Sequence, residues 1–382
     1  MDFSFSEDQQ LLRRSVREFA ESEIGPHVMA FDEAQEFPHA LVKAAAAQGY
    51  YGVLFPEELG GAGLGYVEYV IVVEELSRVD GSIGISVAAH NSLCTNHVFA
   101  CGDDAQRNKY VPKLASGDWI GAWSLTEPTA GSDAGGTKTK AVPQPGGGWV
   151  LNGSKTFTTH GSVGDLTIVF AVTDAEREKK GISAFAIEKG TPGFRAGKKE
   201  NKMGLRASDT AEVVMEDCVL PKEALVGVRG EGFVDAMKIL DGGRISIAAL
   251  ALGMARGAYD AALAYSKQRQ QFGKPIAEFQ AVQHMLAEMA TRLDAATLLV
   301  YRAAWKKDRG ETTTLESSMA KLYASEIGVY VADRALQIFG GYGYVKDFPV
   351  EKFYRDMKLC TIGEGTSEIQ RLVIAREILK AL

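Results

Sequence analysis

A single carboxylate, Glu364, stands between two glycines in residues 361–371, close to the end of the chain. Ser367 and Gln370 follow it at the spacing of a capping box, which predicts Ser367 as the N-cap of a helix that begins at about Glu368. The glycines let backbone amides approach a ligand closely. A carboxylate base beside an N–H donor is what abstraction of a weakly acidic C–H proton needs, because negative charge then accumulates on a carbonyl oxygen. The alternative is an ordinary surface acid, since Asp and Glu are favoured near helix N-termini.

A second stretch, residues 123–136, is rich in hydroxyl groups and glycines around one proline. Such a loop offers backbone N–H and side-chain O–H donors to the polar edge of a ring or to a phosphate. Taken alone, the same composition also fits a turn between two strands.

Two further stretches carry groups that suit a nucleotide. Residues 269–276 place Arg269 and Phe272 at a helix–loop junction, and Gln280 follows shortly after. A guanidinium suits a pyrophosphate, and an aromatic face suits an adenine. Residues 337–341 end a helix with two glycines, which indicates either a plain C-cap or a close approach to a ligand.

Composition excludes several classes of protein. A chain of 382 residues with 46% apolar residues predicts two or three domains with a large core. The net charge of −7 and the scattered basic residues argue against nucleic-acid binding. The four cysteines form no CxxC pair and the six histidines show no metal-ligand spacing, so we expect a reducing compartment and no metal site.

The chain is expected to be soluble and intracellular. Its first residues resemble neither a signal peptide nor a transit peptide, and no apolar run approaches the roughly 20 residues that span a bilayer. We therefore expect a bacterial cytoplasmic protein, or a mitochondrial matrix protein if the chain is the mature form of an imported one.

The elements that must position these stretches fall into three blocks. Helical periodicity follows a capping box at Ser6 and Gln9, and recurs over 40–48, 67–78, about 82–100 and 105–115. Residues 60–65 fail the G-x-G-x-x-G spacing and are predicted to be a loop. Short β-rich runs separated by turns follow at 149–151, 156–158, 166–172 and 182–187. A further strand pair is predicted at 211–215 and 218–220.

Long helices are predicted again after Gly227, at about 233–265, 276–307 and 313–339, followed by the terminal helix. Short strands without intervening helices indicate an antiparallel sandwich or barrel, and four helices with short connections indicate an antiparallel bundle. The predicted fold is α+β multidomain. It has an N-terminal all-α domain (1–119), a central antiparallel β-sandwich or barrel domain (120–226) and a C-terminal four-helix bundle (227–382).

The four stretches, in this order and at these separations, resemble the acyl-CoA dehydrogenase family over essentially the whole chain. Leu-Thr-Glu-Pro-x-x-Gly-Ser-Asp at 125–133 and Glu-Gly-Thr-Ser-Glu-Ile-Gln-Arg at 364–371 are highly specific for that family. Arg-x-x-Phe-Gly-Lys at 269–274 and Gln-Ile-Phe-Gly-Gly-x-Gly-Tyr at 337–344 are moderately specific.

The resemblance implies non-covalent FAD as the cofactor. Residues that would line the flavin are Trp123, Leu125, Thr126, Gly131, Ser132, Phe157, Thr158 and Thr159. Residues that would reach the FAD of a neighbouring subunit are Arg269, Gln271, Phe272, Gln280, Gln337, Gly340 and Gly341. Thr366 and Glu368 would contact the cofactor beside the base. A site completed across an interface implies an oligomer, and the family pattern is a homotetramer.

The resemblance also implies the reaction and its partner. Glu364 would remove the α-proton of an acyl-CoA while hydride leaves the β-carbon for flavin N5, which gives a trans-2-enoyl-CoA. The oxyanion would accept hydrogen bonds from the N–H of the base and a ribityl hydroxyl. Excluding water would raise the pKa of the base. Electrons would pass to an electron-transferring flavoprotein, in fatty-acid β-oxidation or amino-acid catabolism.

The acyl group is expected to be short or branched. By the same resemblance, the substrate-binding residues would be Ser132, Asp241, Arg244 and Gly365, although an intrahelical ion pair is an alternative for Asp241 and Arg244. Some relatives carry the acid at the position of Gly243, where no second base exists here. Gly363 replaces the commoner tyrosine, which would widen the pocket. The two glycines at 242–243 cost the helix roughly 1–2 kcal/mol relative to alanines, which indicates a need for space or for close approach.

Three alternative functions are also compatible with the sequence. An acyl-CoA oxidase would share the fold and pass electrons to oxygen, although the extra C-terminal domain typical of large oxidases is not expected here. Nitroalkane oxidation or flavin monooxygenation would use an aspartate or no acid at the position of Glu364. A non-catalytic flavoprotein would show no bleaching of its flavin by any acyl-CoA.

Overall fold

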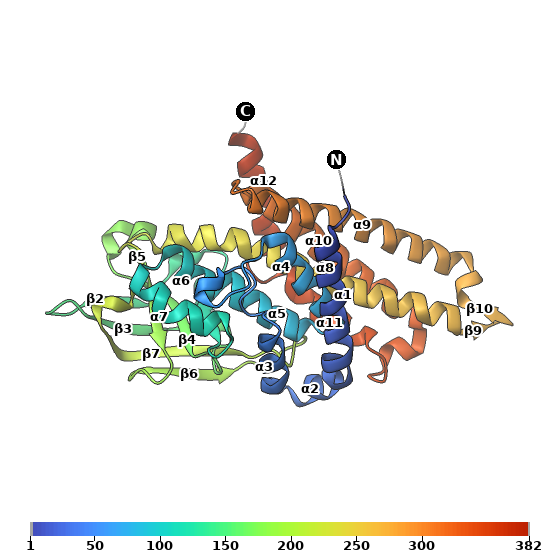
Figure 1. Cartoon of the computed structure of the whole chain (residues 1–382), viewed down its shortest axis with the longest axis horizontal. Helices are drawn as coiled ribbons and strands as arrows, with labels where there is room; N and C mark the ends of the chain where they lie inside the picture. The colour runs from blue at the N-terminus through green and yellow to red at the C-terminus, as the bar shows by residue number, and fades with distance from the viewer. Residues whose placement is uncertain (1–2, 381–382) are drawn as a thin grey trace.

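Helices, a sheet and a second set of helices follow one another in the computed structural model, which describes residues 3–380 (Figure 1). The first set comprises α1 (Glu7–Phe19), α2 (Val28–Ala34), α3 (His39–Ala47), α4 (Tyr66–Val79), α5 (Gly81–Ala89), α6 (Asn96–Cys101) and α7 (Asp104–Ala115). The capping box at Ser6 and Gln9 is confirmed at the start of α1. The helix predicted over 82–100 is interrupted by a π-helical turn, His90–Thr95. Residues 60–65 are a loop, as predicted.

The central strands are β1 (Gly121–Ser124), β2 (Lys140–Pro143), β3 (Trp149–Thr159), β4 (Leu166–Val172), β5 (Ile182–Glu188), β6 (Phe194–Lys199), β7 (Thr210–Leu220) and β8 (Leu225–Val226). They form one sheet in the order β6-β7-β3-β2-β4-β5-β8, with β1 also paired to β4. The pairs are antiparallel, except that β4 runs parallel to β1 and at one residue pair to β2. The prediction of antiparallel pairing therefore misses the parallel placement of β1.

Two strand predictions were wrong in detail. The runs 149–151 and 156–158 both belong to β3, and the predicted pair 211–215 and 218–220 is the single strand β7. The register of β3 against β7 shifts after Leu151 and after Lys155. Because a bulge breaks the alternation of inward and outward side chains without ending the pairing, period counting divides a bulged strand into pieces.

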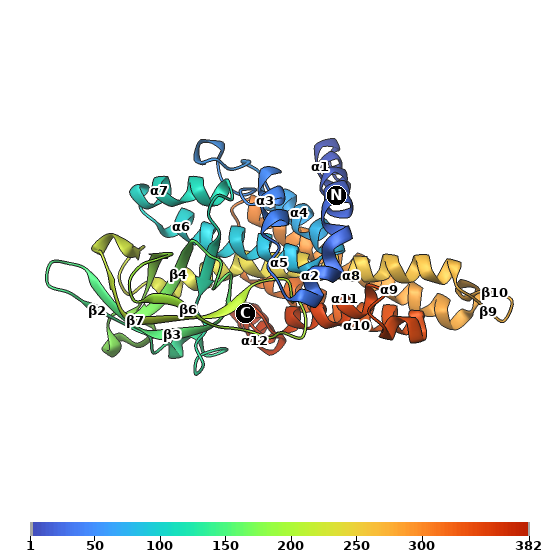
Figure 2. The same cartoon turned by 90° about the horizontal axis from the view of Figure 1, so that it is seen from below.

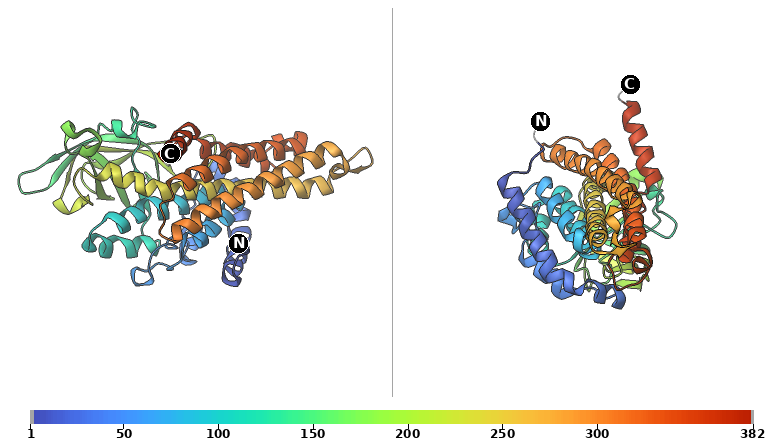
Figure 3. Two further views of the ribbon diagram at one scale, coloured as in Figure 1. Left: turned by 90° about the horizontal axis from the view of Figure 1, so that it is seen from above. Right: turned by 90° about the vertical axis from the view of Figure 1, so that its right-hand side faces the viewer.

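The second set of helices comprises α8 (Gly232–Gln268), α9 (Gln280–Asp308), α10 (Thr314–Phe339), α11 (Val350–Met357) and α12 (Ser367–Lys380). The four predicted helices are present, and α11 was not predicted. The short hairpin of β9 (Gln270–Gln271) and β10 (Lys274–Pro275) joins α8 to α9 at the end of the molecule opposite the sheet (Figures 1 and 2). Helix α12 projects from the bundle (Figures 1 and 3). The residue boundaries of the three domains stay predictions.

Helix α8 lies at the centre of the fold, where it contacts α4, α5, α9, α10 and α11. By length and composition alone it is apolar enough to cross a membrane, contrary to the expectation that no apolar run is long enough. About two-thirds of its most apolar stretch is buried inside the protein. Small residues line this helix because neighbours approach it from several sides.

One apolar cluster joins the segments that carry the predicted site. Leu93 of the π-helical turn, Leu125 after β1 and Leu240 of α8 belong to the same buried cluster. The N-terminal helices, the sheet and the bundle therefore meet at these side chains, and the packing fixes their relative positions.

Candidate active site

Glu364 lies in the turn between a 3₁₀ turn, Lys358–Thr361, and α12, as the sequence predicts. Its φ is +51° and that of Gly365 is +91°, so two consecutive residues are left-handed. This conformation costs a non-glycine residue roughly 1–2 kcal/mol, and the surroundings must hold it.

The predicted capping box at Ser367 was wrong. Ser367 is the first residue of α12, and the hydroxyl oxygen of Thr366 accepts from the N–H of Ile369 at 3.3 Å. Gln370 does not reach back to Ser367. Its Nε2 donates to the carbonyls of Glu364 and Gly365 at 3.2 and 3.0 Å. The left-handed turn leaves these two carbonyls without helical partners, so the glutamine side chain supplies them.

The carboxylate of Glu364 lies directly over Gly243 of α8. A Cβ at position 243 would overlap Oε2 of Glu364 and would lie 3.0 Å from Cδ2 of Leu93. The neighbouring Gly242 has a different reason to be small, because a Cβ there would lie 2.7 Å from the hydroxyl of Tyr66. The expectation that glycines at 242–243 provide space is therefore confirmed.

Burial sets the acidity of Glu364. It raises the pKa of this carboxyl from the ordinary 4.5 to about 7, although the charges of Lys321 and Arg244 act in the opposite direction. At neutral pH the group is therefore present both as a proton acceptor and as a proton donor. A pKa near the working pH suits a general base or acid.

Asp241 and Arg244 form the intrahelical ion pair that the sequence allowed as an alternative. Nη1 of Arg244 lies 2.6 Å from Oδ1 of Asp241, and Oδ2 of Asp241 accepts from the hydroxyl of Thr314 at 2.6 Å. Burial lowers the pKa of Arg244, while Asp241 and Glu364 favour its charged form. The pair places a buried cation close to Glu364.

Buried polar atoms without partners gather around the same turn. Among the described residues, Oε2 of Glu364, Nε of Arg244, Oγ of Ser367 and Oε1 of Gln370 have no hydrogen-bond partner. Buried polar groups are normally satisfied, so such a cluster calls for an explanation. A polar ligand beside Glu364 would supply the missing partners.

The predicted flavin loop lies along one edge of β3. The hydroxyls of Ser124 and Thr158 are 2.6 Å apart, and the N–H of Thr156 donates to the carbonyl of Thr126 at 2.9 Å. The bulge in β3 after Lys155 places Phe157 at a φ of +55°, and the residue is 66% exposed. A β-bulge often re-aims a side chain next to a site.

The remaining predicted flavin residues lie on β1, on the loop that follows it and at the end of β3. Trp123 is half-buried and its Nε1 donates to His97 at 3.4 Å, while Leu125 is buried and Thr159 is partly so. Gly131 and Ser132 are exposed, and nothing would obstruct a Cβ at Gly131. Open hydroxyls and an exposed aromatic ring beside one strand edge suit a planar aromatic cofactor.

A buried ion pair that the sequence did not predict holds this loop. Nζ of Lys155 lies 2.7 Å from Oε1 of Glu127 and donates to the carbonyl of Leu125 at 3.2 Å. Glu127 also accepts from the backbone N–H groups of Lys138 and Thr139 at 2.8 and 3.0 Å. These contacts fix residues 125–127 on β3.

The predicted nucleotide-binding residues lie elsewhere. Arg269, Gln271 and Phe272 are at the β9–β10 hairpin, at the end of the bundle opposite the sheet (Figure 2). The guanidinium of Arg269 is 5.3 Å from the ring of Tyr342, which places residues 337–341 at the same end. Gln280 begins α9, and Phe272 is 94% exposed. A single chain therefore does not bring this set to the flavin loop or to Glu364.

The remaining predicted residues lie at the ends of helices α10 and α12. Gly340 is the C-cap of α10 with a φ of +62°, which is the plain alternative for that stretch. Thr366 serves as the cap of α12, and Glu368 lies exposed in its first turn. The carbonyl of Gly365 accepts from Gln370 and also from Nζ of Lys321 at 2.7 Å.

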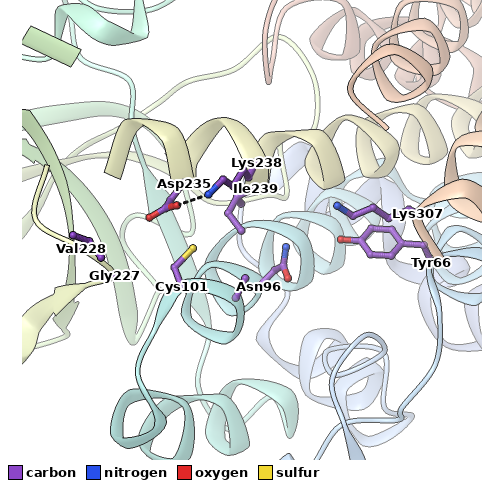
Figure 4. Close-up of a pocket in the computed structure, with 10 residues that line it drawn as sticks. Tyr66, Asn96, Cys101, Gly227, Val228, Asp235, Lys238, Ile239 and Lys307 are labelled. Atoms are coloured by element: carbon purple, nitrogen blue, oxygen red, sulfur yellow. Dashed lines mark hydrogen bonds and ion pairs between the residues drawn. The ribbon is translucent and has the colours of Figure 1, made fainter. Parts of the chain in front are cut away.

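A surface cavity of about 410 Å³ lies apart from this constellation. Its lining includes Tyr66 of α4, Asn96 of α6 and the α8 residues Asp235, Lys238 and Ile239 (Figure 4). Nζ of Lys238 lies 3.2 Å from Oδ1 of Asp235. Figure 4 shows this pair away from Tyr66. Neither Glu364 nor the flavin loop lines this cavity.

Sequence reasoning missed Lys321 and misread Gln370. Lys321 is buried on the face of α10 that carries Ser317, Ala320 and Ala324. The helical spacing of small residues around a lone lysine was the available signal. It did not indicate which segment the lysine would meet.

Family models match three consecutive parts of the chain. They are described as the acyl-CoA dehydrogenase N-terminal domain over residues 6–118, the middle domain over 122–218 and the C-terminal domain over 230–379. Together these matches cover most of the chain.

Characterised relatives are similar over nearly the full length. A short-chain-specific acyl-CoA dehydrogenase of Clostridium acetobutylicum is 48% identical over 380 residues, covering 100% of both chains. Subunit CarC of the caffeyl-CoA reductase–Etf complex of Acetobacterium woodii is 44% identical over 377 residues, covering 98% of this chain and 99% of that one.

Solved structures share the fold. The butyryl-CoA dehydrogenase of Megasphaera elsdenii superimposes with a TM-score of 0.97 at 42% identity, covering 99% of this chain and 100% of that one. The FAD complex of PigA superimposes with a TM-score of 0.94 at 32% identity, covering 99% of each chain.

Proposed function

The chain belongs to the acyl-CoA dehydrogenase family, and from that premise we propose that Glu364 removes the α-proton of a short-chain acyl-CoA. The protein is an FAD-dependent oxidoreductase of that family. The environment of the Glu364 carboxyl is the observation that supports its assignment as the base. Glu364 is a partly buried residue whose carboxyl has a pKa of about 7 and a buried, unpartnered Oε2, and it lies over a glycine that leaves it room.

The residues present fit FAD. The exposed ring of Phe157 and the half-buried ring of Trp123 offer apolar contact to an isoalloxazine. Thr126 and Ser132 offer hydroxyl groups from the adjoining loop, and the Lys155–Glu127 pair keeps that loop in place. When bound, FAD supplies the acceptor for the hydride that leaves the β-carbon of the substrate.

The chain's own residues carry the proton chemistry. Oε2 of Glu364 accepts the α-proton. The backbone N–H of Glu364 is the proposed donor to the thioester oxygen, where negative charge develops. Arg244, held by Asp241, lends positive charge beside the ionised base. The apolar side chain of Leu93 faces the same glycine and helps to keep water from the carboxylate.

The acyl group is proposed to be short, with branched or ring-bearing groups as the next candidates. The similarity to a short-chain-specific acyl-CoA dehydrogenase and to a butyryl-CoA dehydrogenase supports the short chain. The backbone does not require glycine at position 363, because a Cβ there would meet Leu359 at an ordinary 3.6 Å. The lack of a side chain directly before Glu364 is what supports branched or ring-bearing groups.

The electron acceptor is proposed to be an electron-transferring flavoprotein. The similarity to a subunit of a reductase–Etf complex supports this partner over oxygen. We further propose a homotetramer, because Arg269, Gln271, Phe272, Gln280 and residues 337–341 lie far from the flavin loop of their own chain. The bacterial cytoplasm, or the mitochondrial matrix, stays the proposed location.

A second candidate is the reverse reaction, reduction of an enoyl-CoA. The pKa of about 7 favours it as much as dehydrogenation, because protonated Glu364 would donate the α-proton. The similarity to a caffeyl-CoA reductase subunit gives this direction a precedent among relatives.

Anaerobic titration of the FAD-loaded protein with a panel of acyl-CoAs tests the proposal. Butyryl-CoA should bleach the flavin absorbance at stoichiometric amounts, and longer straight chains should do so less completely. If no acyl-CoA bleaches the flavin and no enoyl-CoA reoxidises the reduced protein, the proposed function is wrong. Peroxide formation in air by reduced protein with bound product would identify an oxidase instead.

A further inference from the structure

Lys321 is a buried cation that touches the catalytic turn. Its side chain is fully buried in α10, and its Nζ donates to the carbonyl of Gly365 at 2.7 Å. No carboxylate among the described residues lies within ion-pair distance of it. The other deeply buried lysines differ in this respect, since Lys155 pairs with Glu127 and Lys352 pairs with Asp80 and Asp356.

An ammonium buried without a direct counter-ion is costly, so its position needs a reason. Burial lowers the pKa of Lys321 to about 8, while Cys360 and Glu364 favour its charged form. The lysine therefore still carries its charge at neutral pH. That charge points at the turn that holds the base.

The turn depends on contacts from outside itself. Glu364 and Gly365 are both left-handed, and the carbonyl between Gly365 and Thr366 is fixed by Lys321 from α10 and by Gln370 from α12. Gln370 alone also reaches the carbonyl of Glu364. Removing the lysine contact would leave a strained turn held from one side only.

The charges around Glu364 can be named. Lys321 of α10 and Arg244 of α8 lower its pKa, against the larger effect of burial. Cys360 of the preceding 3₁₀ turn and Glu326 of α10 interact with Lys321, and Tyr69 of α4 interacts with Glu364. Lys321 is the larger of the two favourable charges.

We propose that Lys321 is a positioning residue, which holds the left-handed turn at 364–365 and so keeps the carboxylate of Glu364 over Gly243. The inference rests on the proposed function of Glu364 as the base. It assigns to α10 a part in proton abstraction without contact with the substrate. Because the same ammonium favours the ionised base, its loss should change both the rate and its pH dependence.

The test compares FAD-loaded Lys321→Met with wild type and with Lys358→Met. Lys358 is an exposed lysine in the 3₁₀ turn before the base, so its variant is a matched control for charge. Single-turnover reduction by butyryl-CoA is followed between about pH 6 and 9, with FAD content as the check on folding. Lys321→Met should bind FAD, react at least about tenfold more slowly at pH 7, and show a midpoint raised by about one pH unit.

A second variant and a second measurement keep the outcome decisive. Lys321→Gln retains a hydrogen-bond donor without the charge, so it should recover part of the rate but keep the raised midpoint; it also replaces Lys321→Met should that variant not fold. Infrared titration of the Glu364 carboxyl, with Glu364→Gln as the blank, reads the same shift without turnover. If wild type fails with every acyl-CoA, the proposed function fails, and the infrared shift alone decides the role of Lys321. Rates within about twofold of wild type and an unshifted carboxyl would overturn the inference.

Discussion

Glu364 and Gly243 face each other across the site, and the carboxylate of one occupies the space that a side chain on the other would need. The two residues lie 121 positions apart, on a turn before α12 and on the central helix α8. The glycine is therefore part of the site although it contributes no functional group.

Gly243→Ala should separate catalysis from folding. The added Cβ would overlap Oε2, so the carboxylate must leave its position, while alanine is favoured over glycine in a helix by about 1 kcal/mol. We expect FAD to stay bound and the rate of flavin reduction to fall by at least about tenfold. Gly242→Ala is the control, since its Cβ meets the Tyr66 hydroxyl instead. Equal rates for Gly243→Ala and wild type would show that the base does not act from this position.

The direction of the reaction should set the sign of its pH dependence. Dehydrogenation needs ionised Glu364, so flavin reduction by an acyl-CoA should rise with pH and level off above about 7. Reduction of an enoyl-CoA needs the protonated acid, so its rate should fall above the same pH. Stopped-flow measurement in both directions checks this. Parallel profiles in the two directions would contradict the assignment of one group to both roles.

Glu364 should also weaken the fold at alkaline pH. Its folded pKa of about 7 is above the ordinary 4.5, so the folded state holds this proton more tightly, and stability falls as pH rises from 4.5 through 7. For a fully buried carboxyl, the free energy of unfolding would fall by roughly 3 kcal/mol across this pH range. Glu364 is partly exposed, so we expect a fall of about 1–2 kcal/mol. Glu364→Gln should therefore be more stable than wild type at pH 8 and nearly equal at pH 4.5, by denaturant unfolding of FAD-loaded protein. An equal difference at both pH values would contradict the raised pKa.

Assembly should complete the cofactor site. Arg269 packs on Tyr342 at the end of the bundle opposite the sheet, where it cannot serve the flavin loop of its own chain. Sedimentation should give a mass of four chains, and Arg269→Ala should lose FAD more readily on dilution than wild type. Lys346→Ala, at an exposed surface ion pair with Glu33, is the control. A monomer that retains FAD would contradict the shared site.

The sequence could predict the elements whose signals are local. The capping box of α1, the long helices of the bundle and the turn that carries Glu364 all follow from spacing within a few residues. It could not predict β3 as one strand, because a bulge hides the alternation, nor the parallel pairing of β1 with β4, which joins segments about 45 residues apart. The cap of α12 was misassigned by one residue because Gln370 serves the left-handed turn instead.

The site shows the same division. The motifs singled out Glu364 and the proposed flavin loop, whereas the residues that contact them come from distant segments. Lys321 and Gly243 reach Glu364 only through the packing of α10 and α8. Lys155 reaches Glu127 only through the fold of β3. A single sequence carries no signal for which buried lysine will meet which turn.

The most direct test is the rate of flavin reduction in Glu364→Gln under anaerobic single-turnover conditions with butyryl-CoA. Glu377→Gln, an acid on the same final helix that pairs with Lys380, is the control. The variant should bind FAD and acyl-CoA like wild type, yet reduce its flavin at least about 10²–10⁴-fold more slowly, as loss of a positioned base requires. Reduction at a rate close to that of wild type would show that another group takes the proton.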